Sequence, residues 1–101
     1  MLTIKLYRAI SDAEFQDLIG IGKFRSTPGS LEGKWFALRP EDAKQWGNIL
    51  HGVGNYRIIE VEVSEETADQ FFKLERLDNI GPAAFAEIDQ LGITTFVEVL
   101  V

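Results

Sequence analysis

Hydrophobic and polar residues alternate in several short stretches of the chain, which is the pattern of half-buried β-strands. Over residues 3–8 this alternation places Ile4, Leu6 and Arg8 on one face. Further strands are predicted at 34–38, 56–63 and 93–101, where β-branched and aromatic residues are frequent.

Helix signals separate these predicted strands. Ser11 and Glu14 form a capping box that starts a helix, Leu18 and Ile19 belong to its buried face, and Gly22 allows the chain to leave it. Further helices are predicted at 40–50, 64–72 and 81–91. Because the connections are short, we expect an α+β fold with a small mixed or mainly antiparallel sheet and three to four short helices.

Composition limits the function classes that remain open. With 101 residues, 46% of them hydrophobic and 26% charged, the chain is expected to fold as one domain over residues 1–101. It has no cysteine and one histidine, which excludes disulfides, cysteine zinc sites and two-histidine metal sites. The net charge of -6 opposes binding to nucleic acid, so we expect no nucleic-acid partner. No apolar run is long enough to span a membrane, so we expect no membrane partner and a cytoplasmic location.

Arg8 is the first candidate for chemistry, because the alternation places a guanidinium on the face of two apolar residues. Such a charge requires a partner. It can form a structural ion pair with one of the sixteen carboxylates, or it can clamp a phosphate or carboxylate of a ligand.

Two adjacent aromatic residues, Trp35 and Phe36, follow a Gly-rich segment that contains Ser30. Neighbouring residues of a strand point to opposite faces of a sheet. One ring can therefore belong to the core while the other forms the wall of a binding site, where it would stack on a flat heterocycle; the simpler alternative is that both pack in the core.

Glu87 stands among alanine, phenylalanine and isoleucine residues. It is either an ordinary solvent-facing residue of a helix or a cleft carboxylate that stabilises positive charge on a sugar ring. Glu60, Glu62 and Glu98 are alternatives for the carboxylate that reaches Arg8.

These segments together resemble the ADP-ribosyltransferase fold, in particular its small bacterial toxin-like members. The resemblance lies in Leu6-Tyr7-Arg8-Ala9, Gly33-Lys34-Trp35-Phe36-Ala37, Pro40-Glu41-Asp42-Ala43 and Glu87. It implies that NAD is the substrate. Arg8 would hold its diphosphate, the Trp35–Phe36 strand with Ser30 would form the nicotinamide pocket, and Glu87 would be the catalytic residue that bonds the ribose.

The chain departs from this family in three ways, since it lacks a Ser-Thr-Ser run, has Phe85 two positions before Glu87, and is short for a complete transferase. The resemblance therefore implies an NAD-binding transferase-like or NAD-glycohydrolase-like domain, or a degenerate member without activity. The alternative is a non-enzymatic acidic domain of the inhibitor or immunity type that binds a protein partner. A third reading is a homodimer that pairs through the β-rich segment 94–101.

Overall fold

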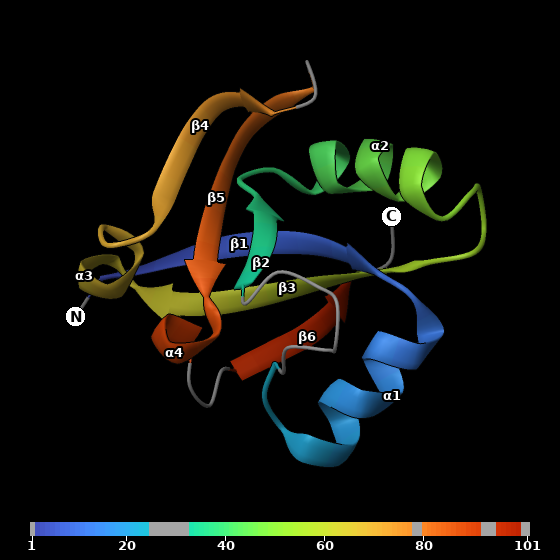
Figure 1. The fold of residues 1–101 in the computed structure, drawn as a ribbon, viewed down its shortest axis with the longest axis horizontal. Helices are drawn as coiled ribbons and strands as arrows, with labels where there is room; N and C mark the ends of the chain where they lie inside the picture. Colours follow the sequence, from blue (N-terminus) through green and yellow to red (C-terminus); the bar gives the residue numbers. More distant parts are fainter. Residues whose placement is uncertain (1, 25–32, 78–79, 92–94, 100–101) are drawn as a thin grey trace.

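A computed structural model describes residues 2–24, 33–77, 80–91 and 95–99. Six strands form one sheet in the order β4-β5-β2-β1-β3-β6, and every pairing is antiparallel. The elements are β1 (Thr3–Ile10), α1 (Asp12–Ile21), β2 (Gly33–Ala37), α2 (Pro40–Leu50), β3 (Arg57–Ser64), α3 (Glu65–Ala68), β4 (Phe72–Leu77), β5 (Gly81–Glu87), α4 (Ile88–Leu91) and β6 (Thr95–Val99) (Figure 1). The predicted α+β class with a mainly antiparallel sheet is confirmed.

The sheet has two halves that meet at a narrow seam between β1 and β2. Eight register pairs join β1 to β3, whereas Tyr7 opposite Ala37 is the single register pair between β1 and β2. The strands β2 and β5 therefore cross β1 at a steep angle instead of lying along it (Figure 1). A seam of this kind leaves room for cavities, because the backbone bonds that would close it are missing.

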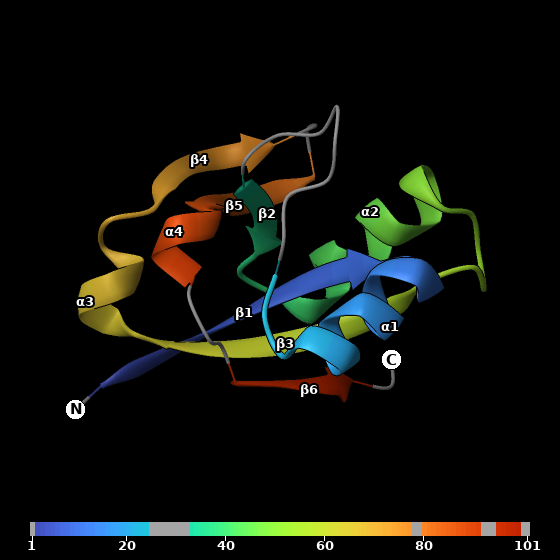
Figure 2. The ribbon, with the colours of Figure 1, turned by 60° about the horizontal axis from the view of Figure 1, so that its bottom comes forward.

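Hydrophobic residues pack on both faces of the sheet. The larger cluster includes Leu6, Ile10, Leu18, Phe24, Phe36, Ile59, Val61, Phe71, Ala84 and Ala86. The smaller cluster consists of Ala9, Ala37, Ala43, Trp46, Ile58 and Ala83, and joins α2 to the opposite face. Figure 1 shows α2 and α1 on opposite sides of the β1–β3 pair, and Figure 2 shows both helices toward the same end of β1.

The caps of α1 explain where this helix begins and ends. Ser11 accepts a hydrogen bond from the backbone N–H of Glu14, which is one of the two bonds of the predicted capping box, while the Glu14 carboxylate bonds Arg8. Gly22 adopts φ 82°, a left-handed conformation that costs glycine least, and its N–H donates to the carbonyl of Leu18.

Two of the predicted helices are wrong in extent. The helix predicted over 64–72 contains only Glu65–Ala68, and Phe72–Leu77 is strand β4. The helix predicted over 81–91 contains only Ile88–Leu91, since Gly81–Glu87 is strand β5. Sheet pairing outweighs the helix propensity of the alanines here, because three of them are buried between the layers.

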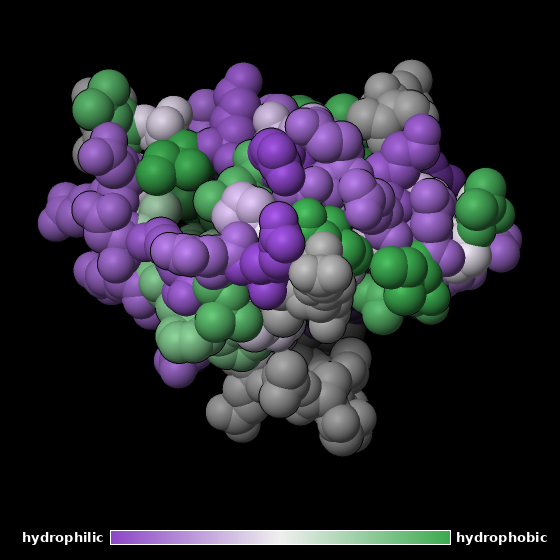
Figure 3. All heavy atoms as spheres, turned by 90° about the horizontal axis from the view of Figure 1, so that it is seen from above, coloured by the Kyte–Doolittle hydropathy of each residue, from purple (hydrophilic) through white to green (hydrophobic). Residues whose placement is uncertain are grey.

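Ile19, assigned to the buried face of α1, is exposed by 54%, and Leu50, which helical spacing from Ala43 and Trp46 predicts to be buried, is exposed by 68%. Of Phe71 and Phe72, either of which the helix predicted at 64–72 could bury, Phe71 is buried and Phe72 is exposed by 59%. Two more exposed residues, Ile49 and Val53, lie near the C-terminal end of α2. Figure 3 shows hydrophobic side chains at its right-hand end, over the turn between α2 and β3, while hydrophilic residues cover much of the same view.

The two edges of the sheet differ. β4 carries Lys73 and Arg76 and has an irregular register between Leu74 and Leu77. β6, which falls within the predicted pairing segment 94–101, forms the other edge and exposes Val97. Among the described residues, no helix is long and apolar enough to cross a membrane.

Candidate ligand-binding cavity

Arg8 is held by groups of the chain itself. Its Nε and Nη2 atoms donate to the two carboxylate oxygens of Glu14 at 2.9 and 3.1 Å, and its Nη1 donates to the carbonyl of Trp35 at 3.1 Å. This is the bidentate geometry for which a guanidinium is suited. The structural ion pair that the sequence left open is therefore present, and its carboxylate belongs to the capping box of α1.

The carboxylates proposed earlier for Arg8 have other neighbours. Glu62 accepts a hydrogen bond from Thr3, and Glu98 binds Arg57. Glu60 lies 4.0 Å from the ammonium of Lys5. Spacing within strands does not predict the pairing of Arg8 with Glu14, because Glu14 lies on a helix, whereas the three predicted carboxylates lie on strands.

Glu14 is also the carboxylate that faces Lys34 of β2. The distance from Lys34 Nζ to Glu14 Oε1 is 4.0 Å, which is too long for a hydrogen bond. Only 10% of the Lys34 side chain is exposed. Burial lowers the pKa of this ammonium, the charges of Glu14 and Asp17 act in the opposite direction, and the charge of Arg8 adds to the lowering.

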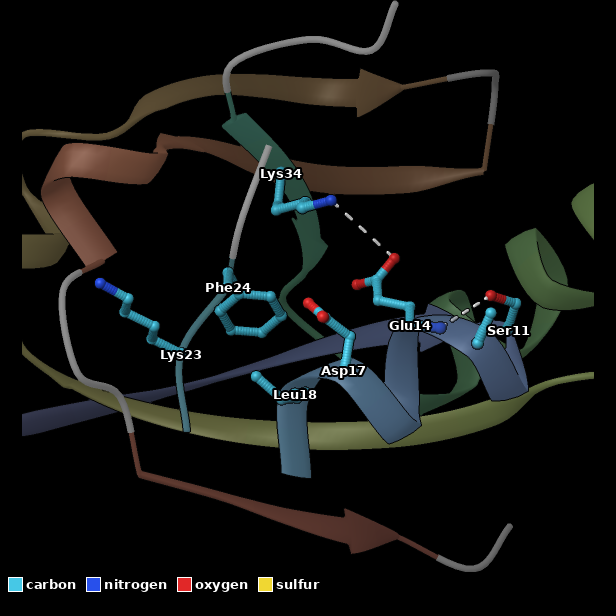
Figure 4. Close-up of a pocket in the computed structure, with 8 residues that line it drawn as sticks. Ser11, Glu14, Asp17, Leu18, Lys23, Phe24 and Lys34 are labelled. Atoms are coloured by element: carbon cyan, nitrogen blue, oxygen red, sulfur yellow. Dashed lines mark hydrogen bonds and ion pairs between the residues drawn. The ribbon is translucent and has the colours of Figure 1, made fainter. Parts of the chain in front are cut away.

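A cavity of about 350 Å³ opens between α1 and the start of β2. Figure 4 shows Lys34 and Glu14 pointing toward one another across it, with Phe24 and Leu18 alongside. Its lining consists of Ser11, Ala13, Glu14, Asp17, Leu18, Lys23, Phe24 and Lys34. A volume of this size is at the lower end of the range of about 300–1,000 Å³ that is typical of small-molecule sites.

The charges around this cavity differ from those of the whole chain. Among the described lining residues, Lys23 and Lys34 stand against Glu14 and Asp17, and the Arg8 guanidinium bonds Glu14 from outside the lining. The chain as a whole carries -6. The described lining is therefore balanced in charge within an acidic protein, so it opposes an anionic ligand less than the rest of the chain does.

The two predicted aromatic site residues point to opposite faces, as the alternation requires. Phe36 has no exposed surface and meets Phe24 edge to face, with ring centroids 5.7 Å apart, so it belongs to the core. Trp35 is half-buried and lies against the rings of Phe72 and Phe85 at 6.2 and 5.1 Å. Its ring is on the face of the sheet away from Arg8, so only its carbonyl contacts Arg8.

Glu87 is exposed at the end of β5. It stands opposite Gly33 in the register, two positions from the pair of Phe85 with Trp35. Residues paired across strands share a face, so Glu87 lies on the Trp35 face while Arg8 lies on the other. The structure does not bring these two predicted site residues together, and Ser30 lies outside the described residues.

Sequence reasoning missed Lys34 and Glu14 as site residues. Lys34 is a lysine two positions from Phe36 in a short apolar strand, so period two placed it on the core face. That was the signal that could have found it.

Among the described residues, no group of three or more His, Cys, Asp or Glu side chains is placed to hold a metal ion. Comparisons of the chain with protein-family models, with curated proteins and with solved structures found no match.

Proposed function

We propose that this chain binds a dinucleotide of the NAD class in the cavity between α1 and β2. The observation that carries the proposal is the buried ammonium of Lys34 in the wall of this cavity. A buried cation without a close hydrogen-bonded carboxylate costs stability, and a ligand phosphate would satisfy it.

The other lining groups suit the remaining parts of such a ligand. Ser11 and Asp17 offer oxygen atoms to ribose hydroxyls, and Leu18 with Phe24 offers an apolar wall to a base. The volume is sufficient for the diphosphate and one nucleoside, so the second nucleoside would lie outside the cavity. This proposal keeps the NAD ligand that the resemblance to ADP-ribosyltransferases implies, and moves the anion contact from Arg8 to Lys34.

Binding is better supported than turnover. Glu87, the proposed catalytic carboxylate, stands on the far face of the sheet, and Glu14 is already bonded to Arg8. A domain that binds NAD without cleaving it is consistent with the degenerate member that the sequence left open.

Calorimetric titration with NAD tests the proposal, with nicotinamide release followed in the same samples. We expect binding by the wild type, a loss of about tenfold to a hundredfold in affinity for Lys34→Met, and no release. Lys44→Met, which removes an exposed lysine of α2, is the matched control and should bind normally. Absence of heat in the wild type, or equal loss in both variants, would refute the assignment. Release that disappears in Glu87→Ala would restore the enzyme hypothesis.

One observation favours the alternative of an acidic protein-binding domain. Arg8 is satisfied internally, while Glu65, Glu66 and Asp69 are all exposed around the short helix α3. Such a surface would meet a basic partner through interactions that weaken as salt is added. If NAD does not bind, replacing these three carboxylates with lysines should abolish binding to a basic partner without changing the free energy of unfolding by more than about 0.5 kcal/mol.

A further inference from the structure

A second cavity lies at the other side of the seam and differs in chemistry from the first. It has a volume of about 240 Å³, and its apolar lining is formed by Ile4, Leu6, Leu38, Ala68, Phe71 and Ala84. These residues come from β1, β5, α3 and the segments that follow β2 and α3. The single register pair between β1 and β2 explains why the backbone does not close this space.

The floor of this cavity is a preformed part of the core. Leu6, Ala68, Phe71 and Ala84 are each exposed by 4% or less, whereas Leu38 at the mouth is exposed by 38%. Small alanine side chains leave the depression, and the fixed large side chains around it keep its shape. A depression with an apolar floor of this kind offers contact surface to a small apolar group.

Lys5 and Lys73 also line the cavity, and the strand register shows which of them lies on the face of the cavity. Lys73 pairs with Ala84, so its side chain lies on the face of the cavity. It is exposed, and none of the hydrogen bonds or ion pairs of the described residues uses it. Lys5 pairs with Glu62 and its ammonium approaches Glu60, both on the opposite face. Lys73 is therefore the cation available at the mouth.

We propose that this cavity binds an amphiphilic carboxylate, with its short alkyl chain against the apolar lining and its carboxylate beside the Lys73 ammonium. An apolar floor alone would accept any small hydrocarbon, and the lysine at the mouth selects one with an anionic end. The site shares no lining residue with the cavity between α1 and β2, so it stands independently of the NAD proposal.

Calorimetric titration with butanoate, hexanoate and octanoate tests the alkyl part. Each added methylene should raise the affinity about fourfold while the chain still fits. No binding of octanoate at millimolar concentration, or an affinity independent of chain length, would overturn the proposal.

Variants test the position and the charge. Leu38→Glu places a carboxylate at the mouth and should abolish octanoate binding, while Leu2→Glu, at a residue that is 73% exposed and outside the lining, should leave it unchanged. Both positions are exposed, so circular dichroism should show both variants folded. Lys73→Gln should weaken octanoate up to about fivefold and leave octanol binding unaffected.

The same titration separates the two cavities. Octanoate should bind Lys34→Met as it binds the wild type, and NAD should not compete with it. Loss of octanoate binding in Lys34→Met would place the anion in the other cavity and overturn this assignment, whatever the outcome for NAD.

Discussion

Lys34 carries a charge at a place where burial disfavours it. Its nearest carboxylate, Glu14, is shared with Arg8 and bonds Arg8 more closely. Natural proteins keep such unfavourable charges mostly where function requires them. Burial of the Lys34 charge therefore lowers the stability of the fold, and this single residue marks the cavity as a candidate site.

This cost predicts that Lys34→Met stabilises the protein, by about 1 kcal/mol at neutral pH. Arg8 still neutralises Glu14 in the variant, so no uncompensated carboxylate is created. Urea unfolding of the two proteins measures the difference. A lysine with a purely structural role would give the opposite sign, because its loss would leave the fold less stable.

The pH dependence follows from the direction of the shift. Burial lowers the pKa of Lys34 in the folded chain below its ordinary value of 10.5. Between these two values the unfolded chain binds more protons than the folded one, so the Lys34 contribution to stability rises with pH. The advantage of Lys34→Met is complete below the folded-state pKa and should shrink as the pH approaches 10.5. Unfolding curves from pH 7 to pH 10 would contradict this if the advantage stayed constant.

At the scale of elements, replacing a glycine with alanine is expected to have opposite effects on stability in β2 and in α1. A Cβ on Gly33 of β2 would lie 2.5 Å from the ring of Phe85 and 2.6 Å from the carbonyl oxygen of Ala86. A Cβ on Gly20 of α1 would meet nothing within 4 Å. Gly33→Ala should therefore destabilise by about 1–3 kcal/mol, whereas Gly20→Ala should stabilise by about 0.5–1 kcal/mol.

Thermal unfolding of both variants measures these effects. Equal effects of the two substitutions would show that β2 and β5 do not approach as closely as the register implies.

The sequence was informative where an element carries its own end signals. Ser11 and Gly22 mark both ends of α1, and the alternation in 57–64 identifies β3. The residues after Ala68 lack a helix stop, so the predicted helix extends through Phe72, although Phe72, Lys73, Leu74 and Glu75 alternate with period two. In β5, alanines are buried on both faces, which removes the alternation that identifies a strand.

The site was harder to predict than the fold, for a geometric reason. The alternation identifies Arg8 as a charge that requires a partner. The capping box already explains Glu14, so the sequence gives no separate reason to pair Glu14 with Arg8. The separation of Arg8 from Glu87 depends on the registers of two strand pairs, β1 with β2 and β2 with β5, and no local pattern contains that information.

At the scale of the whole molecule, the seam predicts unequal stability of the two halves of the sheet. β1 and β3 share eight register pairs, and β6 extends this half with five more. The half formed by β2, β5 and β4 is attached to β1 through one register pair and through side-chain packing around Phe36. Regions with fewer cross-connections open locally at lower free energy than the global unfolding.

Native-state hydrogen exchange should show this difference. The amides of 33–37 and 81–87 should exchange at least about tenfold faster than those of 3–10 and 57–64, because the first set can open without disrupting β1–β3. Lys34 of β2 lines one proposed cavity and Ala84 of β5 lines the other, so NAD should slow exchange at β2, and octanoate should slow it at the β5 residues that line its cavity. Uniform protection of all four segments would mean that packing around Phe36 couples the halves into one cooperative unit, and that ligands stabilise the sheet only as a whole.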